Sequence, residues 1–151
     1  GARRKEAGQL KRIDPLRSYK ETQIKTATPG KLVVMLYDGA VKYLSLALEA
    51  LNSRHHSYDR VSEQLIRTQD IITELMVSLD FDHGGEIARG LFNLYMWMNR
   101  QLLDGNIRKD TAPLESVRGV LLELRSAWAE LTEKAGSEAP ARSAGGVNIA
   151  G

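Results

Sequence analysis

The sequence predicts an all-α fold, an antiparallel up-down helical bundle of four long helices with a short N-terminal helix or cap and flexible ends. Apolar residues recur three or four positions apart over four stretches of about 20 residues, which is typical of bundle helices. Capping residues and short polar segments separate these stretches, and none of them alternates as a strand would. The 151 residues, 42% of them hydrophobic, are enough for one core.

The folded domain is predicted to span residues 15–134. It follows a polar, basic arm over residues 1–14, which is expected to be disordered. A flexible tail rich in Gly, Ala and Ser is predicted over residues 135–151. Before the first long helix, three apolar residues are expected to lie in a short helix or an extended segment: Leu16, Tyr19 and Ile24.

The first long helix is predicted to begin at Pro29 and to run to about Asn52. Thr28 is a suitable N-cap, because its hydroxyl can accept a hydrogen bond from the first turn. Proline suits the next position, where its missing N–H leaves no bond unmade.

The second helix is predicted to begin at Tyr58 and to stop near Asp80. Its inward face is formed by residues three or four apart: Val61, Leu65, Thr68, Ile72, Leu75 and Leu79.

Phe81 through Gly85 has the composition of a turn, so the third helix is predicted to begin at Glu86. Gly105 fits the C-cap region of that helix. Its apolar face is predicted to consist of Ile87, Leu91, Leu94, Tyr95, Met98 and Leu102.

The fourth helix is predicted to follow an N-cap at Asp110 or Thr111, with Pro113 in its first turn. Its apolar stripe is predicted to consist of Leu114, Val117, Leu121, Leu124 and Trp128.

The first and third helices carry more apolar residues than one core-facing stripe needs. In the first helix, the residues expected to face the core are Leu32, Leu36, Tyr43, Ala47 and Ala50. The remaining apolar side chains predict either a fully enclosed central helix or a groove for an amphipathic partner segment, and we favour the groove. The candidate groove residues are Tyr37, Val41, Leu44 and Leu48 on the first helix and Leu91, Tyr95 and Met98 on the third.

Leu16, Tyr19 and Ile24 are also candidates for partner binding. They are expected either to cover part of this groove as a movable lid or to form a fixed cap.

The sequence predicts no enzyme, metal site or cofactor. It contains no cysteine, and its three histidines, His55, His56 and His83, fall in predicted loops without the Glu-x-x-His pattern of di-iron bundles. It also lacks the glycine-rich loops that bind phosphate groups. A small-ligand or metal-binding bundle remains a rival hypothesis that metal analysis would test.

The charge is unevenly distributed. Residues 1–28 carry eight Lys or Arg against three Asp or Glu, although the whole chain has a net charge of only +2. A basic arm can touch nucleic acid, but this one has no aromatic residue before Tyr19 for base stacking, so a solvated arm is favoured and nucleic-acid binding is a rival hypothesis. No apolar run approaches membrane-spanning length and no signal peptide is evident, which favours a cytoplasmic protein.

Several motifs follow one another in a familiar order. Thr26 to Leu32 reads Thr-Ala-Thr-Pro-Gly-Lys-Leu, and Met35 to Ala40 reads Met-Leu-Tyr-Asp-Gly-Ala. Later segments are Gln69-Asp70-Ile71-Ile72, Ser78-Leu79-Asp80, Gly84-Gly85-Glu86-Ile87-Ala88 and Leu94-Tyr95. This series, over about residues 16–130, resembles the flagellar secretion chaperone family FliS. One departure is Leu94-Tyr95-Met96-Trp97-Met98, where the family often has Leu-Tyr-Asp-Tyr-Met.

The resemblance implies a cytoplasmic export chaperone. Such a protein binds the disordered C-terminal segment of flagellin, prevents its premature polymerisation and delivers it to the export gate of the flagellar type III secretion apparatus. It implies no cofactor, and it leaves open whether a cytoplasmic flagellar regulator is a further partner.

Overall fold

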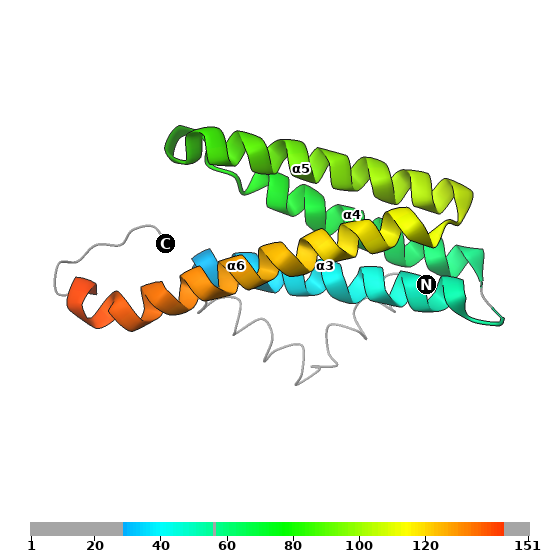
Figure 1. The fold of residues 1–151 in the computed structure, drawn as a ribbon, viewed down its shortest axis with the longest axis horizontal. Helices are drawn as coiled ribbons and strands as arrows, with labels where there is room; N and C mark the ends of the chain where they lie inside the picture. Colours follow the sequence, from blue (N-terminus) through cyan, green and yellow to red (C-terminus); the bar gives the residue numbers. More distant parts are fainter. Residues whose placement is uncertain (1–28, 56, 144–151) are drawn as a thin grey trace, which may run out of the picture.

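The computed structural model describes residues 29–55 and 57–143, with side chains up to residue 135. This part of the chain forms four helices: α3 (Pro29–Asn52), α4 (Tyr58–Val77), α5 (Phe81–Arg108) and α6 (Thr111–Ser143). Consecutive helices run antiparallel, as Figure 1 shows. The predicted all-α up-down bundle is therefore confirmed, while the N-terminal helix or cap and the arm before it lie outside the described residues.

Each of the last three helices begins at a side chain that satisfies free backbone N–H groups, as helix starts require. Ser57 Oγ accepts a hydrogen bond from the Arg60 N–H at 3.4 Å. Asp80 Oδ1 accepts from the N–H groups of Asp82 and His83, both at 3.1 Å. At the start of α6, Asp110 is the N-cap, and its Oδ1 accepts a hydrogen bond from the Ala112 N–H at 3.1 Å.

The bounds of α5 differ from the prediction at both ends. Phe81 through Gly84 form a helical turn rather than a loop, because Asp80 caps it, and Gly85 then breaks the helical geometry with φ 50° and ψ −124°. The helix also runs beyond Gly105 and ends at Arg108, with Lys109 in the left-handed conformation. Gly105 is buried within α5, so its small size serves packing there and not the reversal of the chain.

The fourth helix is longer than predicted. It continues to Ser143, whereas a flexible tail was expected to begin at residue 135. Residues 144–151 lie outside the described part of the chain.

The helices form a ring in which α3 packs against α4 and α6, and α5 packs against the same two helices. The two interfaces that α3 makes are more extensive than the two that α5 makes. The core-facing stripe of α3 consists of Tyr37, Ala40, Leu44, Ala47 and Leu48, with Ala50 following near its end. Leu32, Leu36 and Tyr43, which the sequence placed in the core, are only half-buried, whereas Ala47 and Ala50 are buried as predicted.

The predicted inward faces of α4 and α6 are largely confirmed. Every predicted residue within α4 is buried, and Leu79, which was predicted on this helix but lies two residues beyond its end, is half-buried. On α6, the first three predicted residues are buried and the last two, Leu124 and Trp128, are half-buried. On α5 the prediction was wrong for Ile87, which is exposed, because its neighbour Ala88 takes the inward position.

Candidate functional site

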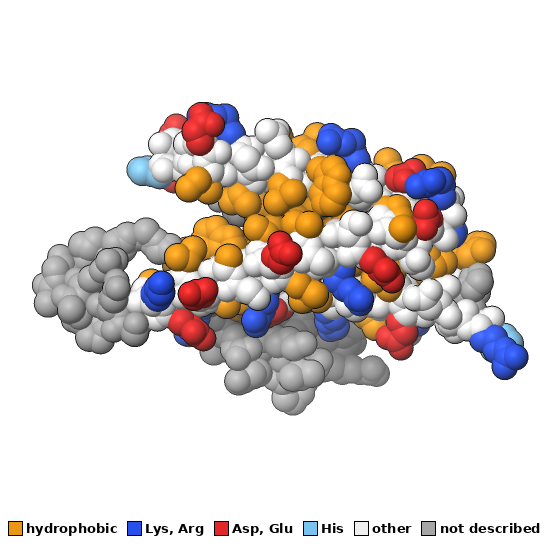
Figure 2. All heavy atoms as spheres, viewed as in Figure 1, with side chains coloured by type: hydrophobic (Ala, Val, Ile, Leu, Met, Phe, Trp, Pro, Cys, Tyr) orange, Lys and Arg blue, Asp and Glu red, His pale blue; other side chains and the backbone are white. Residues whose placement is uncertain are grey.

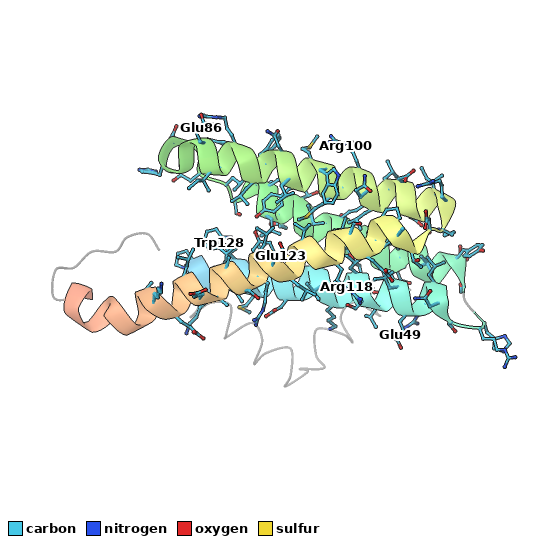
Figure 3. All side chains as sticks on the ribbon, viewed as in Figure 1. Glu49, Glu86, Arg100, Arg118, Glu123 and Trp128 are labelled. Carbon is cyan, nitrogen blue, oxygen red and sulfur yellow. The ribbon has the colours of Figure 1, made fainter. Side chains whose placement is uncertain are left out.

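The first candidate site is an apolar hollow between the first half of α5 and the later half of α6. We call it the α5/α6 notch and define it by Ile87, Leu91 and Leu94 on α5 with Leu124, Trp128 and Leu131 on α6. Figure 2 shows hydrophobic side chains along both walls of this hollow. In Figure 3 the side chain of Trp128 projects from α6 toward α5.

The notch is closed at one end by close contact between α5 and α6. A Cβ atom on Gly105 would lie only 2.7 Å from Leu114 Cδ2, so glycine allows the two helices to approach here. The two helices are antiparallel, so residues at equal distances along the chain from Gly105 on α5 and Leu114 on α6 lie opposite one another. Trp128 and Leu91 are each 14 residues from this contact and therefore lie opposite one another. The same counting places Leu131 level with Ala88, at the opposite end.

Figure 1 shows that α5 and α6 are further apart at that opposite end, and large apolar side chains are exposed there. Ile87 is 75% exposed and Leu131 is 58% exposed. Leu91, Leu94, Leu124 and Trp128 are half-buried and pack against the core from the notch. A hollow with a half-buried apolar base and two exposed apolar side chains at its edges suits an amphipathic helix that places its apolar face inward.

Three aromatic side chains from three helices meet beneath the notch. The hydroxyl groups of Tyr37 on α3 and Tyr95 on α5 form a buried hydrogen bond. The indole of Trp128 on α6 approaches the Tyr37 hydroxyl and opposes part of the rise in its pKa. The bond between Tyr37 and Tyr95 satisfies two hydroxyl groups that would otherwise be costly to bury, and it ties α3 to α5.

Both tyrosines stay protonated under ordinary conditions. Burial raises the pKa of Tyr37, and the hydrogen bond to Tyr95 raises it further. Burial also raises the pKa of Tyr95. The pair is thus a neutral structural link rather than a source of charge or of catalytic protons.

Five of the seven predicted groove residues in the described part of the chain lie inside the bundle. Tyr37, Leu44, Leu48, Tyr95 and Met98 are each at most 3% exposed. They do not form an open groove on the free chain, so their assignment to an exposed face was wrong. The periodicity of α3 allows two apolar stripes, and the stripe predicted to form the groove is the one that faces the core.

The remaining predicted residues lie nearer the surface or outside the described part. Val41 is half-buried and packs against the core, and Leu91 forms one wall of the notch. Leu16, Tyr19 and Ile24 lie outside the described residues. Whether any of these side chains contacts a partner stays a prediction.

Sequence reasoning missed Leu131 and the partial exposure of Trp128. Leu131 extends the stripe of α6 by one step of three residues beyond Trp128, so the periodicity contained this signal. The divergence of α5 from α6 has no counterpart in the sequence pattern of either helix, because it depends on how the two helices pack together.

Other features of the described residues offer little for chemistry. No group of three His, Asp or Glu side chains within them could hold a metal ion. None of the helices placed in the structure is long and apolar enough to cross a membrane. A shallow pocket of about 210 Å³ beside the α3–α4 loop is lined mainly by polar residues, among them Glu49, His55 and Arg60.

Comparison with known proteins gives a consistent result. A family model described as "Flagellar protein FliS" matches residues 12–135. The flagellar secretion chaperone FliS of Bacillus subtilis (strain 168) is 36% identical over 115 residues, which cover 76% of this chain and 84% of the relative. The protein of the same name from Salmonella typhimurium is 36% identical over 116 residues, with the same coverage. The Escherichia coli (strain K12) protein of that name is 32% identical over 111 residues, covering 73% of this chain and 80% of the relative.

Proposed function

The chain belongs to the FliS family of flagellar secretion chaperones, and we propose that its cargo is the disordered C-terminal segment of flagellin. By covering apolar faces of this segment in the cytosol, the protein prevents premature polymerisation. It then delivers flagellin to the flagellar type III secretion apparatus. No step of this function requires catalysis or a cofactor.

The observation that carries the proposal is the open α5/α6 notch. A segment that becomes helical only when assembled has an apolar face that needs a matching surface beforehand, because short isolated helices are marginal in water. The notch offers half-buried aliphatic walls and one indole ring, and such aromatic side chains are common anchors of binding energy. Ordering the segment costs free energy, which favours an affinity moderate enough for release at the export apparatus.

Circular dichroism tests the proposal directly. A synthetic peptide from the C-terminal region of flagellin is expected to be disordered alone and to become helical when mixed with the protein. A mixed spectrum equal to the sum of the two separate spectra would count against cargo binding.

A matched pair of variants on α5 tests the location. Ile87 and Ile107 are the same residue type on one helix and are 75% and 74% exposed, but only Ile87 lies at the notch. Ile87→Ala is expected to weaken peptide binding by about 1 kcal/mol, while Ile107→Ala leaves it unchanged. Equal effects of the two variants, measured by isothermal titration calorimetry, would place the cargo elsewhere.

We further propose that Leu16, Tyr19 and Ile24 cover part of the notch until cargo binds. Deletion of residues 1–25 is then expected to raise the affinity for the flagellin peptide. Unchanged or weaker binding would exclude a movable lid and favour a fixed cap.

The export gate and a cytoplasmic flagellar regulator are the further partners proposed. A pull-down from the source cell is expected to recover flagellin foremost. Reduced recovery of flagellin with the Ile87→Ala variant, together with unchanged recovery of the other partners, would assign those partners to other surfaces.

A further inference from the structure

The outer side of α6 carries acidic residues along the α5/α6 notch. We define the acidic rim by Glu123 and Glu130, which are both exposed and which each directly precede a leucine of the notch wall. Counted from the contact at Leu114, they lie level with residues 89–96 of α5. Figure 2 shows acidic side chains on α6 beside the hollow, and Figure 3 labels Glu123 on the same stretch of α6 as Trp128. The acidic rim therefore follows the notch along much of its length.

The two arginines of this part of α6 are turned toward α3. Arg125 Nε donates a hydrogen bond to Asp38 Oδ1 at 2.7 Å, and Arg118 Nη1 donates to Ser45 Oγ at 3.4 Å. Neither residue of the acidic rim makes an ion pair with any residue that the structure describes. The negative charge of the rim is therefore not neutralised by these arginines, which are engaged on the other side of the helix.

The facing side of α5 offers no net charge. Gly90 and Trp97 follow Ile87 by three and ten residues, which are spacings that keep them on the notch side of α5. Gly90 is exposed, while Trp97 is half-buried and packs against the core. Glu86 and Arg89, the charged residues closest in sequence to Ile87, form an ion pair with each other at 2.5 Å. The notch is thus acidic along its α6 side and neutral along its α5 side.

We propose that the notch selects a cargo helix that carries basic side chains along one flank only, the flank that lies on α6. Glu123 and Glu130 are then the specificity-determining residues of the site. They are seven residues apart, about two turns and about 10.5 Å along α6, so the matching Lys or Arg residues of the cargo are also seven positions apart. This inference rests on the proposed cargo site and adds which helical segment fits it.

The asymmetry of charge also fixes the direction in which such a helix lies. A helix that is reversed end to end, with its apolar face still in the notch, carries its basic flank to the α5 side. There it finds no acidic partner, and the acidic rim is left opposite an uncharged flank. Complementary charge therefore distinguishes the two directions, which the apolar walls alone do not.

The acidic rim suits a site from which cargo must later be released. Exposed ion pairs each contribute little to affinity and are weakened by salt, whereas like charges placed together exclude a wrong partner. The rim can thus choose among amphipathic helices of similar apolar content without making the chosen one bind irreversibly.

Two designed amphipathic peptides test the proposal on the full chain. They share one apolar face and differ only at two positions seven residues apart on one flank, which hold lysine in one peptide and glutamate in the other. Fluorescence anisotropy at low ionic strength is expected to show about tenfold tighter binding of the lysine peptide, because the glutamate peptide replaces two attractive contacts by two repulsive ones. The preference is expected to disappear at about 1 M salt, where charges are screened within about 3 Å.

Charge reversal on α6 locates this preference. Glu123→Lys is expected to reduce the preference for the lysine peptide about threefold, and Glu123→Lys combined with Glu130→Lys is expected to reverse it. Glu115→Lys is the matched control, because Glu115 is an exposed glutamate of the same helix that lies one turn before Arg118, on the side of α3. It changes the net charge as much as Glu123→Lys does and is expected to leave the preference unchanged. Thermal unfolding confirms that the variants are folded.

A parallel titration with the flagellin C-terminal peptide separates this inference from the proposed function. If that peptide binds and its binding depends on Ile87, while the two designed peptides bind equally well, the charge selection is wrong and the cargo site stands. If the flagellin peptide does not bind but the lysine peptide is preferred as described, the proposed cargo is wrong and the charge selection stands.

Three results would overturn the charge selection. The first is equal binding of the two designed peptides, or binding of neither, to the full chain. The second is a preference that persists unchanged when Glu123 and Glu130 are both replaced by lysine. The third is a preference that appears only after deletion of residues 1–14, because the acidic rim would then be the binding site of the chain's own basic arm.

Discussion

Substitution of Gly105 by alanine tests the close approach of α5 and α6 that closes the notch. The backbone of Gly105 does not have a positive φ, so alanine is compatible with the helix itself. In an open helical position this change would stabilise the protein by about 0.5–1 kcal/mol, because glycine loses more conformational freedom on folding. At Gly105, however, the added methyl group has no room.

The structure gives the size of the opposing effect. The new Cβ would lie 2.7 Å from Leu114 Cδ2 and 3.2 Å from the backbone oxygen of Asp110. The leucine could adjust only by disturbing the core, and the carbonyl oxygen is fixed by the turn. Overpacking of this kind costs about 1–3 kcal/mol. We therefore expect Gly105→Ala to lower the free energy of unfolding by about 1–2 kcal/mol.

Gly90 on α5 and Gly119 on α6 provide the matched controls. A Cβ at either position would meet nothing within 4 Å. Gly90→Ala and Gly119→Ala are thus expected to stabilise the protein by about 0.5–1 kcal/mol. Urea unfolding followed by circular dichroism, with unchanged m-values, measures all three. If Gly105→Ala is as stable as Gly90→Ala, the helices do not approach closely at this point and the notch is not closed there.

Three further predictions concern the aromatic link, the start of α5 and the core. Tyr37→Phe and Tyr95→Phe should each lower the free energy of unfolding by about 1–3 kcal/mol, because each leaves the buried hydroxyl of the other tyrosine without its hydrogen-bond partner; no loss from either variant in urea unfolding would contradict the buried bond between them. The pKa of Asp80 is lowered, chiefly by backbone and side-chain hydrogen bonds with His83. The Asp80 carboxylate therefore stabilises the first turn of α5 above its unfolded pKa of about 3.9, and this stabilisation is lost as the pH falls through the lower folded pKa. The rate of amide exchange in that turn should depend on pH in this way in the parent protein and should no longer do so in Asp80→Ala. Met98→Ala, at a fully buried position, should destabilise the protein by about 2–5 kcal/mol, and Val41→Ala by clearly less. A larger loss of stability in Val41→Ala than in Met98→Ala, measured by thermal unfolding, would contradict the burial of Met98.

The helices and most of their limits could be predicted because the signals are local. Pro29 marks the start of α3 through its own backbone chemistry, and the stripe from Val61 to Leu75 on α4 follows directly from periodicity. The end of α5 was misplaced because Gly105 carries the usual mark of a helix end. Its actual role is to let Leu114 approach, and that role involves a residue from another helix.

The candidate site could be predicted only in part. Leu91 was correctly singled out as apolar and lies in the notch, whereas Tyr37, Leu44, Leu48, Tyr95 and Met98 are buried in the core. Both apolar stripes of α3 satisfy helical periodicity equally well. The choice between them depends on which neighbours surround the helix, and no local pattern contains that information.

The sequence by itself determined the all-α bundle, the order of its helices and the resemblance to flagellar secretion chaperones. Each of these follows from spacing, capping residues or motifs within single segments. The tertiary structure alone decided which apolar residues remain on the surface. The exposure of Ile87 and Leu131 arises because α5 and α6 diverge from their close contact at Gly105, and that divergence is a property of two packed helices rather than of either segment.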